Sequence, residues 1–302
     1  MMARAAANWQ AERRRAFLIG LLPALVVLAA ITVAPAIYLV VTSLTPLNLL
    51  YPATALDFSD PLLNYREALA DERFVNSVWV QVKLSIATVV LQLLMGLGIA
   101  LLLNIRSKVL EVARSAFLIP MVLPPIVVAI IWKVLYTPDV SPMHRFLAWI
   151  GLPISSLITN PDTALWAIAV AETWEWFPFT MLMVLATLQM IPDEPLEAAR
   201  IDGASNRQLF WHVMLPYVRP TLVVCALFRL IDSIKAFPLI YVLTNGGPGS
   251  VTEVTNYYAF VQAFNFSYWG YASAIATMMV AGVFLLSWLI SRLGGAGTGA
   301  YE

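Results

Sequence analysis

The chain contains a series of long apolar runs separated by polar segments, and this pattern constrains its fold more than any other feature. A helix needs roughly 20 residues to cross the hydrocarbon core of a bilayer. Six runs reach that length, at about residues 17–44, 78–103, 116–136, 164–190, 217–243 and 268–293. Apolar residues make up 60% of the chain and charged residues 12%, unlike a typical soluble domain. We therefore predict an all-α polytopic membrane protein with six transmembrane helices. The prolines of "IPMVLPP" (119–125) predict a kink in the third.

The distribution of positive charge predicts the orientation of these helices. Lysine and arginine near the ends of a span are retained on the cytoplasmic side. A cytoplasmic amino terminus places most of these residues inside and leaves only Arg66, Arg73 and Arg145 outside, among many carboxylates. Both termini are then cytoplasmic, as a segment at 1–16 and a short tail at 294–302, and the transmembrane domain covers 17–293.

The opening of the chain has a second interpretation, as a cleaved signal peptide. The arginines at 13–15 precede an apolar run and the small residues "APA" (34–36), which resemble a cleavage site. However, the apolar run continues through Val41, longer than a usual signal core, and the site contains a proline. We therefore expect this run to remain as a transmembrane helix.

Charge and cysteine content argue against several classes of protein. The formal net charge is zero, so nothing indicates binding to nucleic acid. The single cysteine, Cys225, excludes an intramolecular disulfide, and His144 and His212 lie too far apart in sequence to resemble a zinc motif. A metal site or a redox centre is not expected.

One polar stretch, "EAARIDGASNRQLFWHVMLP" (197–216), interrupts the apolar pattern. A helix is expected over 196–202 with Pro195 in its first turn, and Gly203 ends it. Ser205 and Gln208 form a capping-box pattern that begins a second helix. An apolar stripe then precedes Pro216, formed by Phe210, Val213 and Met214. The stretch could be a solvated connector, but two capped helices with small alanines beside the glycine favour a docking surface.

This stretch resembles the EAA loop of permease subunits in bacterial binding-protein-dependent ABC importers. The matching residues are Glu197, Ala198, Ala199, Asp202, Gly203, Ala204, Phe210, Leu215 and Pro216. A second motif, "LIYVLTNGGPG" (239–249), is similar to one of the two permease types in sugar importers of the maltose, trehalose and glycerol-phosphate group. The resemblance covers about residues 16–293.

The resemblance implies a role and a set of partners. The loop at about 191–216 would be the coupling helix that sits in a cleft of an ATP-hydrolysing subunit. The full assembly would contain a second permease subunit, two ATPase subunits and an extracytoplasmic substrate-binding protein, in the bacterial inner membrane. ATP and magnesium would be bound by the ATPase subunits. In agreement, the chain has no G-x-x-x-x-G-K-[ST] motif, so we expect a transporter subunit without enzyme activity or a cofactor of its own.

Charged residues lie inside two of the predicted spans. The fourth contains Glu172 and Glu175, and the fifth contains Arg229, Asp232 and Lys235. A charge at the centre of a bilayer costs about 2.5–3.5 kcal/mol, so these groups are expected to be paired. Arg229 could pair with Glu175 across the two helices or with Asp232 within one helix.

Two interpretations of these charges remain open. They could only fasten the two helices together, or they could line a polar cavity for a sugar, with Trp174, Trp176, Phe177 and Phe179 offering flat apolar faces. The resemblance places substrate-binding positions at Glu175, Trp176, Phe179, Arg229, Asp232, Ser233 and Ala236. Ala236 has no polar side chain, so hydrogen bonding at that position is not expected.

The favoured function is therefore one half of a pathway that carries a sugar or polyol inward by alternating access. An ion-coupled secondary carrier would also use charges inside the membrane, but it leaves the capped loop unexplained. Glycerol 3-phosphate is a possible substrate because Arg229 and Lys235 could face a phosphate, although Asp232 and Glu175 favour a neutral ligand. A membrane enzyme would need a cluster of catalytic groups, and we find none.

Overall fold

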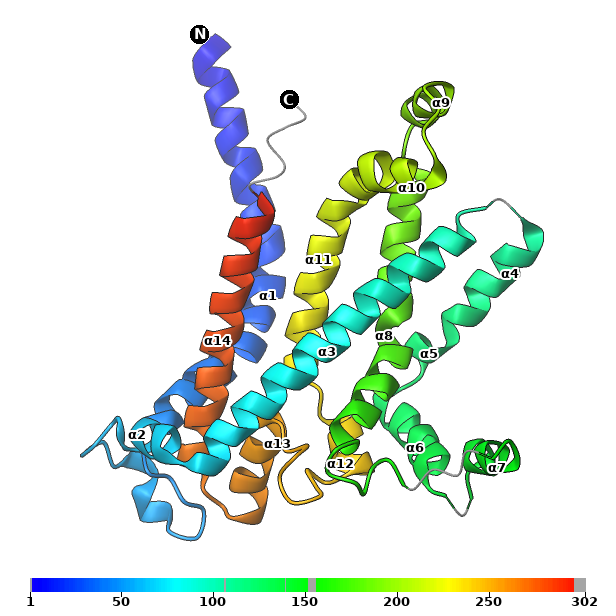
Figure 1. Ribbon diagram of the computed structural model, residues 1–302. Coiled ribbons are helices and arrows are strands. Elements are labelled where there is room, and N and C mark those ends of the chain that lie inside the picture. Colours follow the sequence, from blue (N-terminus) through cyan, green and yellow to red (C-terminus); the bar gives the residue numbers. More distant parts are fainter. Residues whose placement is uncertain (1, 106, 139, 152–155, 296–302) are drawn as a thin grey trace. The chain divides into compact units, whose positions relative to one another are not determined.

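The computed structural model describes residues 2–105, 107–138, 140–151 and 156–295, and the described part of the chain is helical apart from short turns and loops (Figure 1). Five helical segments are long and apolar enough to cross a membrane. Three of them belong to single helices at the start and middle of the chain: Arg15–Ser43 of α1 (Met2–Ser43), all of α3 (Glu72–Leu103) and all of α8 (Ala164–Gln189). The fourth is Asn206–Ile234, whose last part is α11 (Leu215–Ile234). The fifth is Trp269–Ile290 of α14 (Trp269–Gly295). The prediction of an all-α membrane protein is confirmed.

The third predicted span is broken rather than gently kinked. The segments Leu110–Val122 and Pro125–Tyr136 meet at an angle of 97°, and they count as a sixth span only if taken together. They comprise α4 (Lys108–Phe117), α5 (Ile119–Val122) and α6 (Pro125–Tyr136). The break falls at Leu123 and Pro124, where two successive prolines lack backbone N–H donors. The sequence therefore predicted the position of the bend but not its size.

The helix of the fifth predicted span begins and ends earlier in the sequence than the apolar run at 217–243. Its helix begins at Asn206, because α10 (Asn206–Leu209) continues through a π-helical turn (Phe210–Met214) into α11, and Pro216 lies in the first turn of α11 without ending the helix. At the other end α11 stops at Ile234, and α12 (Pro238–Leu243) begins after a non-helical step. Pro238 disfavours helical geometry at Phe237, which explains the early stop.

The remaining helices are short and lie in the connections. They are α2 (Leu63–Ala70), α7 (Pro142–Trp149), α9 (Asp193–Ile201) and α13 (Thr255–Phe260). Within the larger compact unit, which contains residues 69–261, α9 and α10 lie at one end and α12 and α13 at the other (Figure 1). The polar stretch and the TNGGP motif therefore occupy opposite ends of this unit.

The contact between α3 and α8 forms the centre of this unit. The buried face of α3 is a stripe of small and polar residues that includes Ser77, Gln81, Ser85, Thr88, Gln92, Gly96 and Ala100. A Cβ atom at Gly96 would lie only 2.6 Å from the Cβ atom of Thr180 on α8, so the helices approach closely because this position has no side chain.

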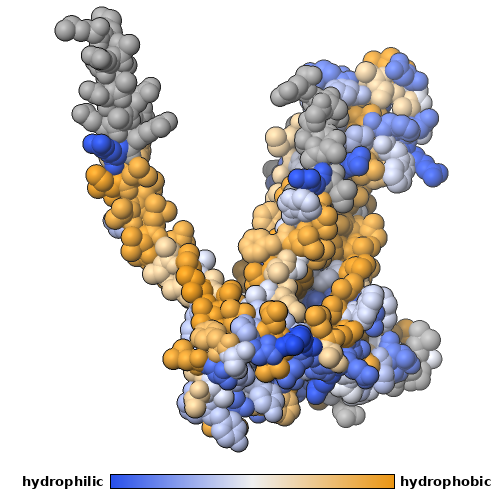
Figure 2. All heavy atoms as spheres, turned by 90° about the vertical axis from the view of Figure 1, so that its left-hand side faces the viewer, coloured by the Kyte–Doolittle hydropathy of each residue, from blue (hydrophilic) through white to orange (hydrophobic). Residues whose placement is uncertain are grey.

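The smaller unit contains the described residues up to Ala68 together with 262–277. Here the buried Asn64 donates hydrogen bonds to the carbonyls of Ser43, the last residue of α1, and of Thr45, at 2.9 and 2.8 Å. Apolar side chains of α1 between Phe17 and Val41 are exposed, and Figure 2 shows apolar residues over the middle of the helices. Such a surface is stable in lipid or against another apolar partner.

Candidate functional site

The polar stretch forms the predicted pair of capped helices. The first, α9, has Pro195 in its opening turn and is followed by Gly203, whose φ of +83° is easily reached only by glycine. Ser205 caps the second helix: its side chain accepts from the Gln208 backbone, and its own N–H donates to the Gln208 side chain at 2.8 Å. The capping box is confirmed, because it depends only on neighbouring residues.

The residues expected to couple to an ATPase lie on an accessible surface of this stretch. Glu197, Ala198, Asp202 and Gly203 are exposed, and Ala199, Ala204 and Phe210 are partly buried. Two apolar side chains that we did not single out are also exposed: Ile201, at 86%, and Trp211, which contacts Phe210 edge-on. An isoleucine within a charged loop was the signal in the sequence. The coupling role of these residues stays a prediction.

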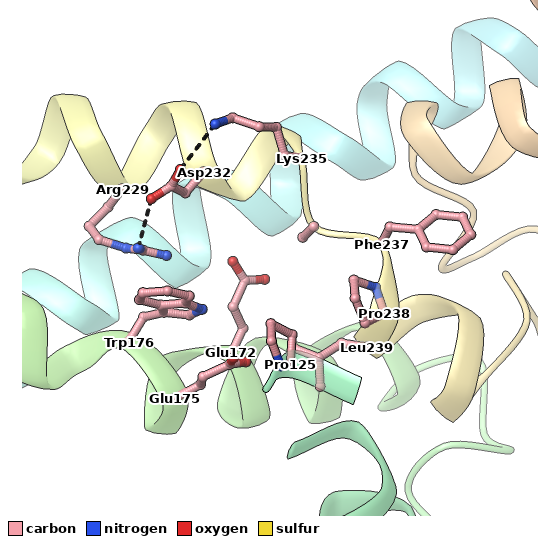
Figure 3. Close-up of a pocket in the computed structure, with 11 residues that line it drawn as sticks. Pro125, Glu172, Glu175, Trp176, Arg229, Asp232, Lys235, Phe237, Pro238 and Leu239 are labelled. Atoms are coloured by element: carbon pink, nitrogen blue, oxygen red, sulfur yellow. Dashed lines mark hydrogen bonds and ion pairs between the residues drawn. The ribbon is translucent and has the colours of Figure 1, made fainter. Parts of the chain in front are cut away.

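Arg229 is the centre of the charge cluster between the helices. It is 2% exposed, and its Nη1 lies 3.1 Å from Oδ2 of Asp232, whose other oxygen lies 3.3 Å from Nζ of Lys235 (Figure 3). Its guanidinium stands over the ring of Trp176, 4.3 Å from the centroid. The structure therefore forms the pair within α11, and it does not form an ion pair between Arg229 and Glu175.

These groups line a cavity of about 220 Å³ between α8, the end of α11 and the start of α12. Five of the predicted substrate positions line it, namely Glu175, Trp176, Arg229, Asp232 and Ala236. The other lining residues are Pro125, Glu172, Lys235, Phe237, Pro238 and Leu239 (Figure 3). The wall therefore combines carboxylates and cations with an indole ring and small apolar surfaces.

Two predicted positions do not line the cavity. Phe179 lies farther along α8 and packs edge-on against Phe228, with ring centroids 6.1 Å apart. Ser233 is buried against α3, where its hydroxyl donates to the Ser85 hydroxyl at 2.8 Å and its carbonyl accepts from Gln81 at 3.1 Å. In this conformation both residues hold helices together.

The other aromatic residues of α8 also face away from the cavity. Trp174 packs edge-on against Trp132, and Phe177 packs edge-on against Phe117. Trp176 is thus the one aromatic side chain of "ETWEWFPF" that lines the cavity. The sequence shows four aromatic residues in this segment of α8, but only the packing of the helix determines which of their rings faces the cavity.

Sequence reasoning missed Gln92, a buried residue that joins three helices at the cavity. Its Oε1 accepts from Nε of Arg229 at 2.9 Å, and its Nε2 donates to the backbone carbonyl of Glu172 at 3.3 Å. Glu172, one of the charges that could line a polar cavity, does line it, although the resemblance did not place it among the substrate positions. The signal for Gln92 in the sequence was its place within the apolar run "VVLQLLMG". A membrane helix rarely carries a glutamine that has no hydrogen-bond partner.

The cavity contains side chains that are suited to binding a polar ligand. Carboxylates accept hydrogen bonds, guanidinium and ammonium groups donate them, and an indole ring offers a flat apolar face. Among the described residues, no three histidine, cysteine, aspartate or glutamate side chains are grouped so that they could hold a metal ion.

A second ion pair, between Arg73 and Glu253, lies at the start of α3. Arg73 binds the carboxylate of Glu253 with two hydrogen bonds, from Nε at 2.7 Å and from Nη2 at 2.9 Å. Glu253 is 2% exposed and follows the loop that contains the TNGGP motif. This two-point contact fastens the loop to the first turn of α3.

Comparison with known proteins identifies relatives over most of the chain. The family model described as "Binding-protein-dependent transport system inner membrane component" matches residues 92–294. The trehalose/maltose transport system permease protein MalF of Thermococcus litoralis is 37% identical over 232 residues, covering 77% of this chain and 78% of that protein. The trehalose transport system permease protein SugA of Mycobacterium tuberculosis is 31% identical, covering 95% and 90%.

A further relative and a solved structure extend this likeness. The sulfoquinovosyl glycerol transport system permease protein SmoG of Agrobacterium fabrum is 34% identical, covering 86% of this chain and 84% of that protein. A chain in the crystal structure of a bacterial ABC transporter involved in the import of the acidic polysaccharide alginate matches with a TM-score of 0.82. It covers 97% of this chain and 99% of that chain at 19% identity, so this likeness concerns the fold.

Proposed function

Because the chain belongs to the family of binding-protein-dependent transport system inner membrane components, we propose that it is the permease subunit of an ATP-driven importer for a sugar or related polyol. It is a multi-pass membrane protein. The names of relatives that cover most of the chain support a carbohydrate substrate, since MalF and SugA are permeases of trehalose/maltose and trehalose systems. Transport proceeds by alternating access.

The observation that carries this proposal is the mixed wall of the cavity. A hydroxyl-rich ligand needs both donors and acceptors close together, and Arg229, Lys235 and three carboxylates supply them. The ring of Trp176 lies beside them and can pack against the apolar face of a sugar ring. We propose that Glu175, Trp176, Arg229, Asp232 and Ala236 contact the substrate, and that Phe179 and Ser233 do so only in another conformation.

The energy for transport comes from partner subunits in this proposal. Two ATPase subunits bind ATP and magnesium, and one of them receives the exposed loop around Glu197, Ala198, Ala199, Asp202, Gly203, Ala204 and Phe210. Because α10 continues into α11 through one helical segment, a movement of the loop reaches the cavity wall directly. This mechanical continuity supports a coupling role for the loop.

The remaining partners complete the pathway across the membrane. A second permease subunit forms the other half of the pathway, and an extracytoplasmic binding protein delivers the substrate. The solved alginate transporter, which was crystallised in complex with a pentasaccharide-bound periplasmic protein, supports such an arrangement by analogy of fold. We place the chain in the bacterial inner membrane with residues 1–16 and 294–302 in the cytoplasm and a transmembrane permease domain over 17–293.

An uptake experiment in cells tests the substrate class. The chain is expressed with its candidate partner subunits, and accumulation of radiolabelled maltose, trehalose, glucose, glycerol and glycerol 3-phosphate is measured. We expect saturable uptake of at least one neutral sugar or polyol, which disappears when the ATPase subunit carries a substitution in its own phosphate-binding lysine. Uptake that survives this substitution would contradict an ATP-driven importer.

A further inference from the structure

A groove between α3 and α8 has a volume of about 640 Å³ and shares no lining residue with the substrate cavity. This volume falls within the range of roughly 300–1,000 Å³ that is usual for small-molecule sites. The wall on α3 is a single helical face that begins at Lys83 and ends at Leu91, and the wall on the other side extends from Pro161 to Ala169. Ile86 on the first wall is exposed, so the groove opens to the surface of the larger unit.

One end of this groove carries two opposite charges. Both α3 and α8 begin at the end of the larger unit where α12 and α13 lie (Figure 1). Lys83 is the first lining residue on α3, and Asp162 lies two residues before α8 begins, so both charges belong to this end of the groove. Among the described residues, neither side chain takes part in an ion pair. The groove therefore offers a donor and an acceptor that the chain itself does not use.

Two tryptophan side chains indicate the depth of this end in the membrane. Trp166 lines the groove, and Trp79 lies one turn before Lys83 on α3; both are more than half exposed, at 60% and 63%. Exposed tryptophans are enriched where the headgroups meet the hydrocarbon, and a lysine can extend its ammonium toward the headgroups. Farther along α3 the lining is apolar, with Val90 and Leu91. The groove thus leads from the headgroup layer into the hydrocarbon.

This combination of charge and depth matches one class of lipid. A phosphatidylethanolamine headgroup contains a phosphate, which accepts from an ammonium, and a primary ammonium, which donates to a carboxylate. A phosphatidylglycerol headgroup could bind Lys83, but it would place its negative charge near Asp162 without an ammonium to compensate. A phosphatidylcholine headgroup has no N–H donor for Asp162.

We propose that the groove between α3 and α8 is a binding site for one phosphatidylethanolamine molecule, with the phosphate at Lys83, the ammonium at Asp162 and an acyl chain along the apolar wall. In the orientation proposed above, this lipid belongs to the extracytoplasmic leaflet. An apolar helix of another subunit would cover the same wall but leave the two charges unpaired.

Native mass spectrometry of the chain purified with its partner subunits tests this site. Delipidated complex in detergent is titrated with phosphatidylethanolamine, phosphatidylglycerol or phosphatidylcholine of identical acyl chains, and the first bound lipid is resolved by its mass. The variants are Lys83→Gln and Asp162→Asn. Lys133→Gln is the matched control for loss of a positive charge, because Lys133 is exposed in the last turn of α6 and does not line the groove.

We expect the wild type to bind phosphatidylethanolamine most tightly of the three. Lys83→Gln should weaken the first binding of phosphatidylethanolamine and phosphatidylglycerol by about 5-fold, the effect of one lysine near an anionic membrane surface, while Lys133→Gln changes neither. Asp162→Asn should remove the advantage of phosphatidylethanolamine over phosphatidylglycerol. Equal affinity for all three lipids in the wild type, or an unchanged preference in Asp162→Asn, would overturn the proposal.

A second measurement locates the bound lipid. Phosphatidylethanolamine with a brominated acyl chain is added at one molecule per complex, and quenching of tryptophan fluorescence is recorded. Trp166→Phe should reduce the quenched fraction, whereas Trp149→Phe should not, because Trp149 is exposed on α7 outside the groove. Equal quenching in the two variants would place the lipid elsewhere and overturn the proposal.

The state of assembly separates this proposal from the proposed function. Binding to the chain alone, with none to the assembled complex, would show that another subunit occupies the groove and would also overturn the lipid site. Failure of any partner subunit to co-purify would instead contradict the importer, and the same titrations on the chain alone would then decide the lipid site.

Discussion

Replacing Gly96 by alanine should loosen the contact between α3 and α8, which positions the cavity wall. The new Cβ atom would lie 2.6 and 2.7 Å from Cβ and Cγ2 of Thr180, and 2.9 Å from the backbone nitrogen of Met181. Carbon atoms in good contact lie about 3.5–4.0 Å apart, so the two helices must separate by roughly 1 Å. The backbone atom cannot rotate away as a side chain can. Overpacking of this kind costs about 1–3 kcal/mol.

Gly98 provides a matched control on the same helix. It is exposed, and a Cβ atom at this position would have no other atom within 4 Å. Alanine has a higher helix propensity than glycine, by about 1 kcal/mol in soluble helices, and this stabilising contribution is the same in both variants. The difference between the two variants therefore isolates the contact with α8, and we expect Gly96→Ala to be less stable than Gly98→Ala by about 1–3 kcal/mol.

Unfolding in mixed micelles measures this difference. The purified chain in dodecyl maltoside is titrated with sodium dodecyl sulfate, and the fluorescence of its tryptophans reports the transition. Gly98→Ala should unfold at the same or a higher fraction of dodecyl sulfate than the wild type, and Gly96→Ala at a lower one. Identical transitions for the two alanine variants would refute the close approach of α3 and α8.

Three further predictions concern the polar contacts. Gln92→Leu should lower the free energy of unfolding by about 1–3 kcal/mol in the same titration, because it leaves Nε of Arg229 buried without a partner; an unchanged transition would show that water replaces Gln92. Arg73→Leu should lower the free energy of unfolding by about 1–3 kcal/mol, because it leaves the buried Glu253 carboxylate unpaired, although Arg73 itself is half-exposed. Adding Glu253→Gln to this variant should recover part of the lost stability. Gly203→Asp should strain the turn by about 1–2 kcal/mol and reduce sugar uptake per ATP hydrolysed, with the cavity's affinity for sugar unchanged; normal uptake would argue against coupling through this loop.

The sequence predicted those parts of the structure that depend on neighbouring residues. Apolar runs of sufficient length determine where helices cross the membrane, and α1, α3, α8 and α14 lie where these runs predicted. The turn at Gly203 and the cap at Ser205 were predicted because their chemistry is complete within a few residues. The bend near Pro124 was predicted in position for the same reason.

Features that depend on contacts between distant segments were not predicted. The cross-helix pair between Glu175 and Arg229 does not form, because Arg229 bonds instead to Gln92 on α3 and to Asp232 on its own helix. The apolar pattern of α8 does not determine the rotation of the helix about its axis, so it offered Trp174 and Trp176 alike as rings of the cavity. Only the resemblance singled out Trp176, which is the one that lines the cavity. Glu172 was expected among the charges that could line a polar cavity, and it does line one, although the resemblance did not place it among the substrate positions.

Sugar uptake into sealed vesicles tests the central claim most directly. The chain is reconstituted into proteoliposomes with a second permease, the ATPase subunits and a sugar-loaded binding protein, and radiolabelled sugar is measured inside with ATP or a nonhydrolysable analogue on the ATPase side. The account predicts accumulation of a neutral sugar that requires ATP hydrolysis and falls with Gly203→Asp. Accumulation driven by an ion gradient without the ATPase subunits would contradict it.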